Sequence, residues 1–264
     1  MPLRGLKESL LWREYTVGET EFLKWEFGDL TIWCKRRGEE IWTTWKYGEV
    51  KDQAEPQEDD DWLRCVPKSK SAKIRLSPAF PDRPLVVHTE GLLSILKDAR
   101  IRILVVVPVW VRLETVSKSV VLTEIPTVRL SKTWFGTPSQ GEKCYWVSSP
   151  AQRSLEAHQI RAFDVVCPVR IVNGSDSDLS LRKLALRVRR LSIFEKDGYL
   201  WADETRINYR GEAEVSSIHF SRKAPPEAEN AKLIAAPRKD TGRGFASKTF
   251  ASLRELSGFG PVVD

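Results

Sequence analysis

The sequence predicts an all-β protein, an antiparallel β-sandwich of the jelly-roll kind with one short C-terminal helix. Three observations predict this class: short runs of β-branched and aromatic residues, turns containing glycine or proline between them, and almost no helical periodicity. The chain has 264 residues, 41% of them hydrophobic, and ten tryptophans. This composition excludes a disordered chain, and the length allows a substantial core without disulfide bonds.

Residues 1–77 are predicted to form a tryptophan-rich β-meander lobe. Trp25 and Phe27 alternate before a turn at residues 28–29, and Leu30, Ile32 and Cys34 then share one face of the next strand. A third run follows over residues 41–47. Short runs joined by glycine-containing turns are typical of a meander. Most tryptophans lie beside other bulky residues, which favours a β core over an exposed sugar-stacking face.

Residues 78–220 are predicted to form the main sandwich domain, and the two lobes would abut. Its strand-like runs cover residues 100–113, 120–125, 128–135, 143–147, 163–172, 179–194, 199–202, 205–209 and 213–220. Within the run over 179–194, the apolar positions change parity around Arg189 and Arg190, which predicts a β-bulge. Asp197 and Gly198 are a hairpin-turn signal.

Residues 221–264 are predicted to be a basic linker followed by the helix. Residues 221–243 contain three prolines among Lys, Arg, Ala and Glu residues, with a short strand over 232–235. Phe245, Thr249, Leu253 and Leu256 fall at helical spacing, which predicts a helix over residues 245–256.

Charge and cysteine usage narrow the class of protein. The net charge of +6, from 42 basic and 36 acidic residues, is spread over an acidic stretch at 49–61 and several basic ones. The four cysteines form no CxxC pair, so we expect reduced thiols, no metal site and no cofactor.

The longest apolar run, residues 103–111, is about half as long as a membrane-spanning helix. With no secretory signal pattern at the start, we expect a cytoplasmic protein without a transmembrane segment.

A hairpin over residues 130–146 provides the first candidate binding site. Bulky residues occupy its two strands, glycines bound its loop, and one acidic residue follows the second glycine. The candidate ligand-binding residues are therefore Trp134, Gly136, Gly141, Glu142 and Tyr145. A plain hairpin loop is the alternative interpretation.

A basic strand face provides the second candidate. Arg187, Arg189 and Arg190 follow one another closely, and a basic strand can track the phosphates of a polyanion. Because no aromatic residue interleaves with them, a solvated sheet face is the alternative interpretation.

Carboxylates in or beside the predicted strands leave a glycosidase open, since such an enzyme needs two carboxyl groups flanking one bond. Convergence of Glu142, Asp164 and Asp203 would decide this question. The sequence contains neither a GxSxG nor an HExxH motif and nominates no catalytic residue.

One block of sequence resembles a known family. Residues 130–138 read Leu-Ser-Lys-Thr-Trp-Phe-Gly-Thr-Pro, and residues 141–145 read Gly-Glu-Lys-Cys-Tyr. Segments 166–173, 184–186 and 200–202 continue the match, so that about residues 20–220 resemble the uncharacterised family known as domain of unknown function four-three-two. The resemblance implies no reaction, cofactor or catalytic residue. Some members are encoded near small mechanosensitive channels, which implies an accessory role at a membrane.

We therefore expect a non-catalytic binding or accessory module that acts through a protein partner, in membrane-associated machinery such as a mechanosensitive channel. A carbohydrate-active enzyme or sugar-binding protein is the alternative, and it requires convergent carboxylates or exposed tryptophans. A nucleic-acid binder using Arg187, Arg189 and the basic tail is the third hypothesis, and it requires salt-dependent binding.

Overall fold

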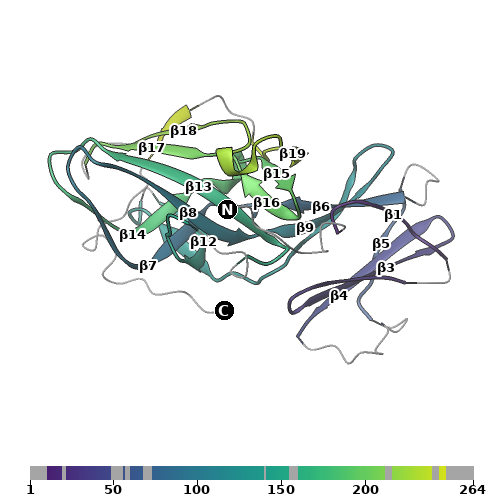
Figure 1. Cartoon of the computed structure of the whole chain (residues 1–264). Coiled ribbons are helices and arrows are strands. Elements are labelled where there is room, and N and C mark those ends of the chain that lie inside the picture. The colour runs from purple at the N-terminus through teal and green to yellow at the C-terminus, as the bar shows by residue number, and fades with distance from the viewer. Residues whose placement is uncertain are drawn as a thin grey trace. The chain divides into compact units, whose positions relative to one another are not determined.

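The chain is nearly all β, as predicted (Figure 1). The structure, a computed structural model, describes residues 11–19, 22–48, 56, 60–67, 73–139, 141–154, 160–211, 216–239 and 244–247. Two compact units are present, and neither is continuous in sequence. The Trp-rich unit comprises residues 8–79 and 109–128, and the main unit comprises residues 1–7, 80–108 and 129–264.

The Trp-rich unit contains two four-stranded antiparallel sheets. The first has the order β1 (Glu14–Thr16), β6 (Lys73–Ala79), β9 (Trp110–Thr115), β10 (Val121–Pro126). The second is the predicted meander, β2 (Leu23–Phe27), β3 (Leu30–Arg37), β4 (Glu40–Tyr47) and β5 (Leu63–Cys65). Phe27, Leu30 and Ile32 are fully buried on one face of that meander, as their alternation predicts.

The other face of the meander carries cation–π contacts. The Lys35 ammonium lies 4.9 Å from the ring of Phe22, 5.2 Å from Trp42 and 4.6 Å from Trp62. The guanidinium of Arg64 lies 4.0 Å from the Trp42 ring. These tryptophans therefore pack against cations of the chain itself, which is a structural role for them.

The main unit contains two mixed sheets. The smaller sheet has the order β11 (Lys132–Phe135), β12 (Glu142–Ser149), β7 (Leu85–Ile95), β14 (Leu179–Leu186). The larger runs β19 (Lys232–Ala235), β15 (Ile193–Lys196), β16 (Tyr199–Ala202), β13 (Asp164–Asn173), β17 (Thr205–Tyr209), β18 (Ser216–Phe220), β20 (Gly244–Ser247), with β8 (Arg100–Pro108) also paired to β13. Three pairs, β12–β7, β13–β16 and β13–β17, are parallel. The sheets are therefore not purely antiparallel, because strands distant in sequence can meet through long crossovers.

Strand β13 is the central strand of the larger sheet. One of its edges pairs with β8 over residues 164–172. The other edge is shared by two consecutive strands, β16 against Val165 and Val166, and β17 against residues 169–173. The chain leaves the ladder between these strands, at Asp203 and Glu204. Pro168, which has no N–H to donate, occupies the corresponding level of β13.

Two sequence predictions are corrected in this unit. Residues 179–194 are not one bulged strand, because β14 ends at Leu186 and a 3-10 helix over Val188–Arg190 precedes β15. The change of apolar parity thus comes from a turn that reorients the chain. The helix predicted over residues 245–256 begins instead as β20, where Phe245 pairs with Ile218 of β18. Backbone pairing with the β18 edge outweighs the local helical spacing, and residues 248–256 lie outside the described residues.

Asn173, at the end of β13, holds the neighbouring turns. Its side-chain amide donates to the carbonyl oxygens of Ile95, Leu96 and Ser177 at 2.9, 3.2 and 2.9 Å. Its Oδ1 accepts from the backbone and hydroxyl of Ser175 at 3.1 and 2.7 Å. Because Asn173 is fully buried, water cannot replace these partners.

We predict that Asn173→Ala lowers the free energy of unfolding by about 2–4 kcal/mol, because it leaves several buried carbonyl groups without donors. Urea denaturation of both proteins measures the difference. The matched control is Asn208→Ala, which removes one exposed hydrogen bond to Ser217 and should cost less than about 0.5 kcal/mol. Equal losses for the two variants would contradict the structural role of Asn173.

Candidate anion-binding site

Three arginines lie in register on neighbouring strands of the larger sheet. Arg170 of β13 pairs with Arg102 of β8 and with Arg206 of β17. We call Arg102, Arg170 and Arg206 the arginine row. His219 of β18 pairs with Arg206 and extends the row by one strand. Like charges at the same level of adjacent strands repel, so the row needs a nearby counter-charge.

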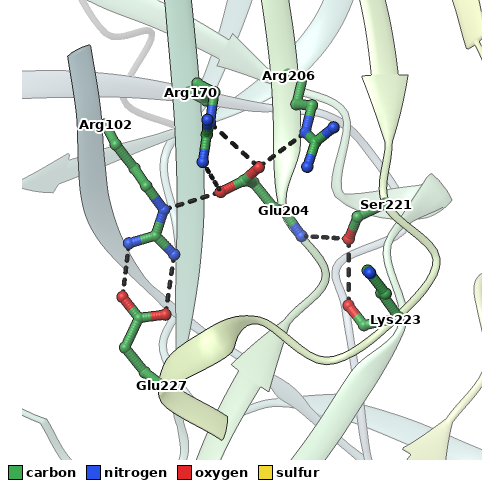
Figure 2. Close-up of polar contacts among 7 residues, drawn as sticks. All are labelled: Arg102, Arg170, Glu204, Arg206, Ser221, Lys223 and Glu227. Carbon is green, nitrogen blue, oxygen red and sulfur yellow. Dashed lines mark hydrogen bonds and ion pairs between the residues drawn. The ribbon is translucent and has the colours of Figure 1, made fainter. Parts of the chain in front are cut away.

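Glu204 supplies that counter-charge (Figure 2). Its Oε2 accepts from Arg102 Nε at 2.8 Å, and its Oε1 accepts from Arg206 Nε at 2.8 Å. Arg170 Nε lies 3.4 Å from Oε1. The Glu204 side chain is only 5% exposed, whereas those of Arg170 and Arg206 are 44% and 53% exposed. One buried carboxylate therefore anchors three guanidinium groups, two of which also face solvent.

Glu227 neutralises Arg102, the member of the row that lies on β8. Its two carboxylate oxygens accept from Arg102 Nη1 and Nη2 at 2.5 and 2.9 Å. This bidentate geometry is the strong form of an arginine–carboxylate pair. Arg102 is thereby held between two carboxylates, whereas Arg170 and Arg206 both pair with Glu204.

The surroundings fix the charge of Glu204. Burial raises the pKa of its carboxyl, but hydrogen bonds from Arg102 and Arg206 and the charges of Arg170 and Arg102 outweigh burial and leave that pKa below its usual value. Glu204 is therefore a stable anion and a poor proton donor.

The interruption between β16 and β17, at Asp203 and Glu204, places the Glu204 carboxylate among the three arginines. Its backbone N–H donates to the Ser221 hydroxyl at 3.0 Å, and the Ser221 N–H donates to its carbonyl at 3.0 Å. The fully buried Asp203 accepts from the backbone N–H groups of Ser192 and Arg222 at 2.7 and 3.3 Å. Burial raises the pKa of Asp203, and these backbone bonds oppose the rise. The backbone at the break is thus hydrogen-bonded on both sides.

A pocket of about 630 Å³ opens beside the row. Its lining residues are Arg170, Phe194, Glu204, Arg206, Ser221, Arg222, Lys223, Ala224, Pro225, Pro226, Glu229, Asn230 and Ala231. Four of these are cationic and two are anionic, so the lining carries a formal charge of 4 − 2 = +2.

Arg190 connects the pocket to the basic segment that the sequence singles out. Burial, and then the positive charge of Arg222, lower the pKa of Arg190. Burial, and then the charge of Arg190, lower the pKa of Arg187 to about 10. The charge of Arg190 acts on Arg187 and that of Arg222 acts on Arg190, so Arg190 lies within electrostatic reach of both. Arg187 immediately precedes the 3-10 helix, and Arg189 and Arg190 lie in that helix rather than on the predicted strand face. The Nε of Arg189 is buried without an acceptor among the described residues.

One family matches this chain, and it is described as protein of unknown function (DUF432), with residues 11–254 matched. The chain belongs to this family. The match confirms the resemblance seen in the sequence and extends it at both ends. No curated protein and no solved structure matches the chain.

The hairpin motif of this DUF432 protein is tied to the basic segment. Glu142 forms an ion pair with Arg187, whose side chain is 10% exposed. Tyr145 donates to Asp82 at 3.0 Å and lies under Arg83. Two candidates from different parts of the sequence, Glu142 and Arg187, therefore meet directly.

The loop of the hairpin is shaped by Trp134. Its indole N–H donates to the Thr137 carbonyl at 3.1 Å. A Cβ built on Gly141 would overlap this indole and lie 2.8 Å from the carbonyl oxygen of Phe135. Gly136, at the other end of the loop, has a φ of +107°, which favours glycine. The hairpin therefore favours glycine at both positions for structural reasons.

The carboxylates weighed for a glycosidase have separate partners. Glu142 pairs with Arg187, Asp164 accepts from Arg161 at 2.8 Å, and Asp203 is bonded to backbone N–H groups. No group of three or more His, Cys, Asp and Glu residues in the described part of the chain could hold a metal ion. Among the same residues, no helix is long and apolar enough to cross a membrane.

Sequence reasoning missed the arginine row, although it considered the neighbouring Asp203. Arg170 sits alone within the apolar run over residues 165–172, whereas Arg102 follows Arg100 and Arg206 precedes Asn208 in alternating strands. A charged residue inside such a pattern is the available signal. The register that aligns the three arginines depends on pairing between strands far apart in sequence, which no local pattern encodes.

We predict that Glu204→Gln lowers the free energy of unfolding at pH 7 by about 1–3 kcal/mol, less than for a fully buried pair because two of the arginines are exposed. The pKa of Glu204 is lowered on folding. The ion pairs of Glu204 therefore contribute fully to the free energy of unfolding above the pKa of the unfolded chain, about 4.3. This contribution is lost as the pH falls through the pKa of the folded protein. The difference between the two proteins should therefore shrink below about pH 4. Urea titrations at several pH values measure it, and Glu26→Gln, which removes an exposed pair with Lys24, should show almost none of it.

We predict that Gly141→Ala displaces the Trp134 indole, because the added methyl group would occupy its position. Trp134 would then lose its hydrogen bond to Thr137. The measurement is tryptophan emission in a Trp134→Phe background and in the native background. A spectral change that persists without Trp134 would refute this contact.

Proposed function

We propose that this DUF432 protein is a non-catalytic binding module that receives an acidic segment of a protein partner on the arginine row. The observation that carries the proposal is the alignment of Arg102, Arg170 and Arg206 around one buried carboxylate. Arg170 and Arg206 keep about half of their side chains exposed. A guanidinium group has five N–H donors, so a carboxylate bonded at Nε leaves donors for a second, bidentate anion.

The environment of the carboxylates supports a binding role rather than a catalytic one. Glu204 is held ionised by three arginines, and Asp203 is fully buried. A glycosidase needs one accessible proton donor and a second carboxylate across the scissile bond. The neighbouring acids at this site do not offer that combination.

The residues around the row favour an acidic protein over a nucleic acid. The next level of the same sheet face carries Arg100, Val172, Asn208 and Ser217, so that level offers no aromatic platform for stacked bases. Glu227 and Glu229 flank the site and would repel a continuous phosphate backbone. A short acidic peptide can place its carboxylates on Arg170 and Arg206 without meeting them.

We place the module in the cytoplasm. The four cysteines, Cys34, Cys65, Cys144 and Cys167, are all free thiols, which fits a reducing compartment. The resemblance described above favours a partner in membrane-associated machinery such as a mechanosensitive channel.

We predict that the full chain binds fluorescein-labelled deca-glutamate and that the double substitution Arg170→Ala/Arg206→Ala weakens binding by about ten-fold or more. Fluorescence anisotropy measures the affinity, and binding should weaken steadily from low to high salt because the contacts are ionic. Arg182→Ala, an exposed arginine on β14, is the control and should bind as the native protein does.

Three outcomes would contradict this function. One is equal peptide affinity for the double variant and the native protein. Another is affinity that does not change with salt. The third is tighter binding of single-stranded oligonucleotides than of the acidic peptide under the same conditions, which would favour a nucleic-acid binder.

A further inference from the structure

We infer that the pocket beside the arginine row binds a small amphiphilic organic anion, a carboxylate head on a short hydrocarbon body. This inference rests on the proposed function, because the pocket shares Arg170 and Arg206 with the row. It goes further by assigning a second class of ligand and the residues that select it.

Part of the pocket lining suits a carboxylate. Arg170, Arg206 and Lys223 belong to it, and the Lys223 side chain has no ion pair among the described residues. Figure 2 shows Lys223 and Ser221 on the same side of Glu204 as Arg206. The lining has a charge of +2 after Glu204 and Glu229 are counted, so the positive excess favours an anionic ligand.

Another part of the pocket lining suits a hydrocarbon. Its apolar lining consists of Phe194, Ala224, Pro225, Pro226 and Ala231. Ala231 packs against a buried cluster that includes Leu104, Val166 and Trp201. An apolar body would therefore contact side chains that continue into the core. A volume of about 630 Å³ lies within the range of small-molecule sites.

The wall of the pocket is fixed before any ligand arrives. Pro226–Ala228 form a 3-10 helix, Glu227 is bonded twice to Arg102, and Lys196 Nζ donates to the Glu229 carbonyl at 3.0 Å. A preformed wall lowers the entropy lost on binding.

Both ends of this wall contain a residue in the left-handed region of backbone conformation. Arg222 has a φ of +58° and Asn230 a φ of +65°. Asparagine adopts this conformation fairly readily, but arginine does so rarely and at a cost in free energy. Strained backbone of this kind gathers at ligand sites, and here both residues line the pocket.

The test uses octanoate as the probe and the full chain as the receptor, with isothermal titration calorimetry as the readout. We expect octanoate to bind and acetate, which has the head without the body, to bind at least about ten-fold more weakly. Octyltrimethylammonium has a similar body with the opposite charge, and it should also bind at least about ten-fold more weakly. Ala224→Phe, which adds bulk to the apolar part of the lining, should weaken octanoate binding by about ten-fold or more.

Two further variants keep the test decisive. Lys223→Gln removes a cation from an exposed position, so the fold should survive even if Ala224→Phe does not fold, and we expect octanoate binding to fall about three-fold or more. Arg182→Ala should bind octanoate as the native protein does. Octanoate affinity that is unchanged in Ala224→Phe and Lys223→Gln, or equal affinity for octyltrimethylammonium, would overturn the inference.

The two proposals fail in distinguishable ways. If deca-glutamate binds and octanoate does not, the pocket inference is overturned and the acidic-partner function stands. If octanoate binds and deca-glutamate does not, the acidic-partner function is overturned and the pocket ligand stands.

Discussion

The two consecutive strands that share one edge of β13 are the constraint on which the rest of this site depends. Because β16 ends before β17 begins, the chain must leave the ladder at Asp203 and Glu204. The same arrangement brings Arg170 and Arg206 to one level of the sheet, beside Arg102 on the opposite edge. Aligned cations would destabilise the sheet, and the interruption delivers the carboxylate that holds them. The interruption of the strand pairing therefore supplies the counter-charge that the arginine row needs.

Local signals predict the elements of this fold well and their assembly poorly. Alternation and glycine turns indicated β2, β3 and β4, and the Asp197-Gly198 turn lies between β15 and β16 as expected. The 3-10 helix at 188–190 was mistaken for a bulge, because both change the parity of apolar residues. The arginine row depends on register between strands that are remote in sequence. Of its members, only Arg170 could be noticed as a single charge within an apolar strand, and the pairing that unites the three required the structure.

The family's hairpin block acquires a structural explanation. Gly141 gives the Trp134 indole its space, and Glu142 neutralises Arg187, which is too buried to be solvated. Arg187 in turn lies within reach of Arg190, and Arg190 within reach of Arg222 at the pocket. Glu142 therefore pairs with the first of three neighbouring cations, Arg187, Arg190 and Arg222, and the last of these lines the pocket. A buried cation tolerates the loss of a strong counter-charge badly, so this hairpin supports the basic segment electrostatically.

The discontinuity of the two units bears on how the chain acquires its structure during synthesis. The Trp-rich unit ends at residue 128, and by then the ribosome has already released residues 80–108. These residues form β7 and β8, whose ladder partners are β12, β13 and β14. Strand β7 must therefore wait with open edges until β12 follows at residues 142–149, and β8 must wait until β13 follows at residues 164–173. At roughly 5–20 residues per second, this wait lasts seconds. Unpaired apolar edges are sites of misassociation, so the nascent chain depends on protection of this one segment.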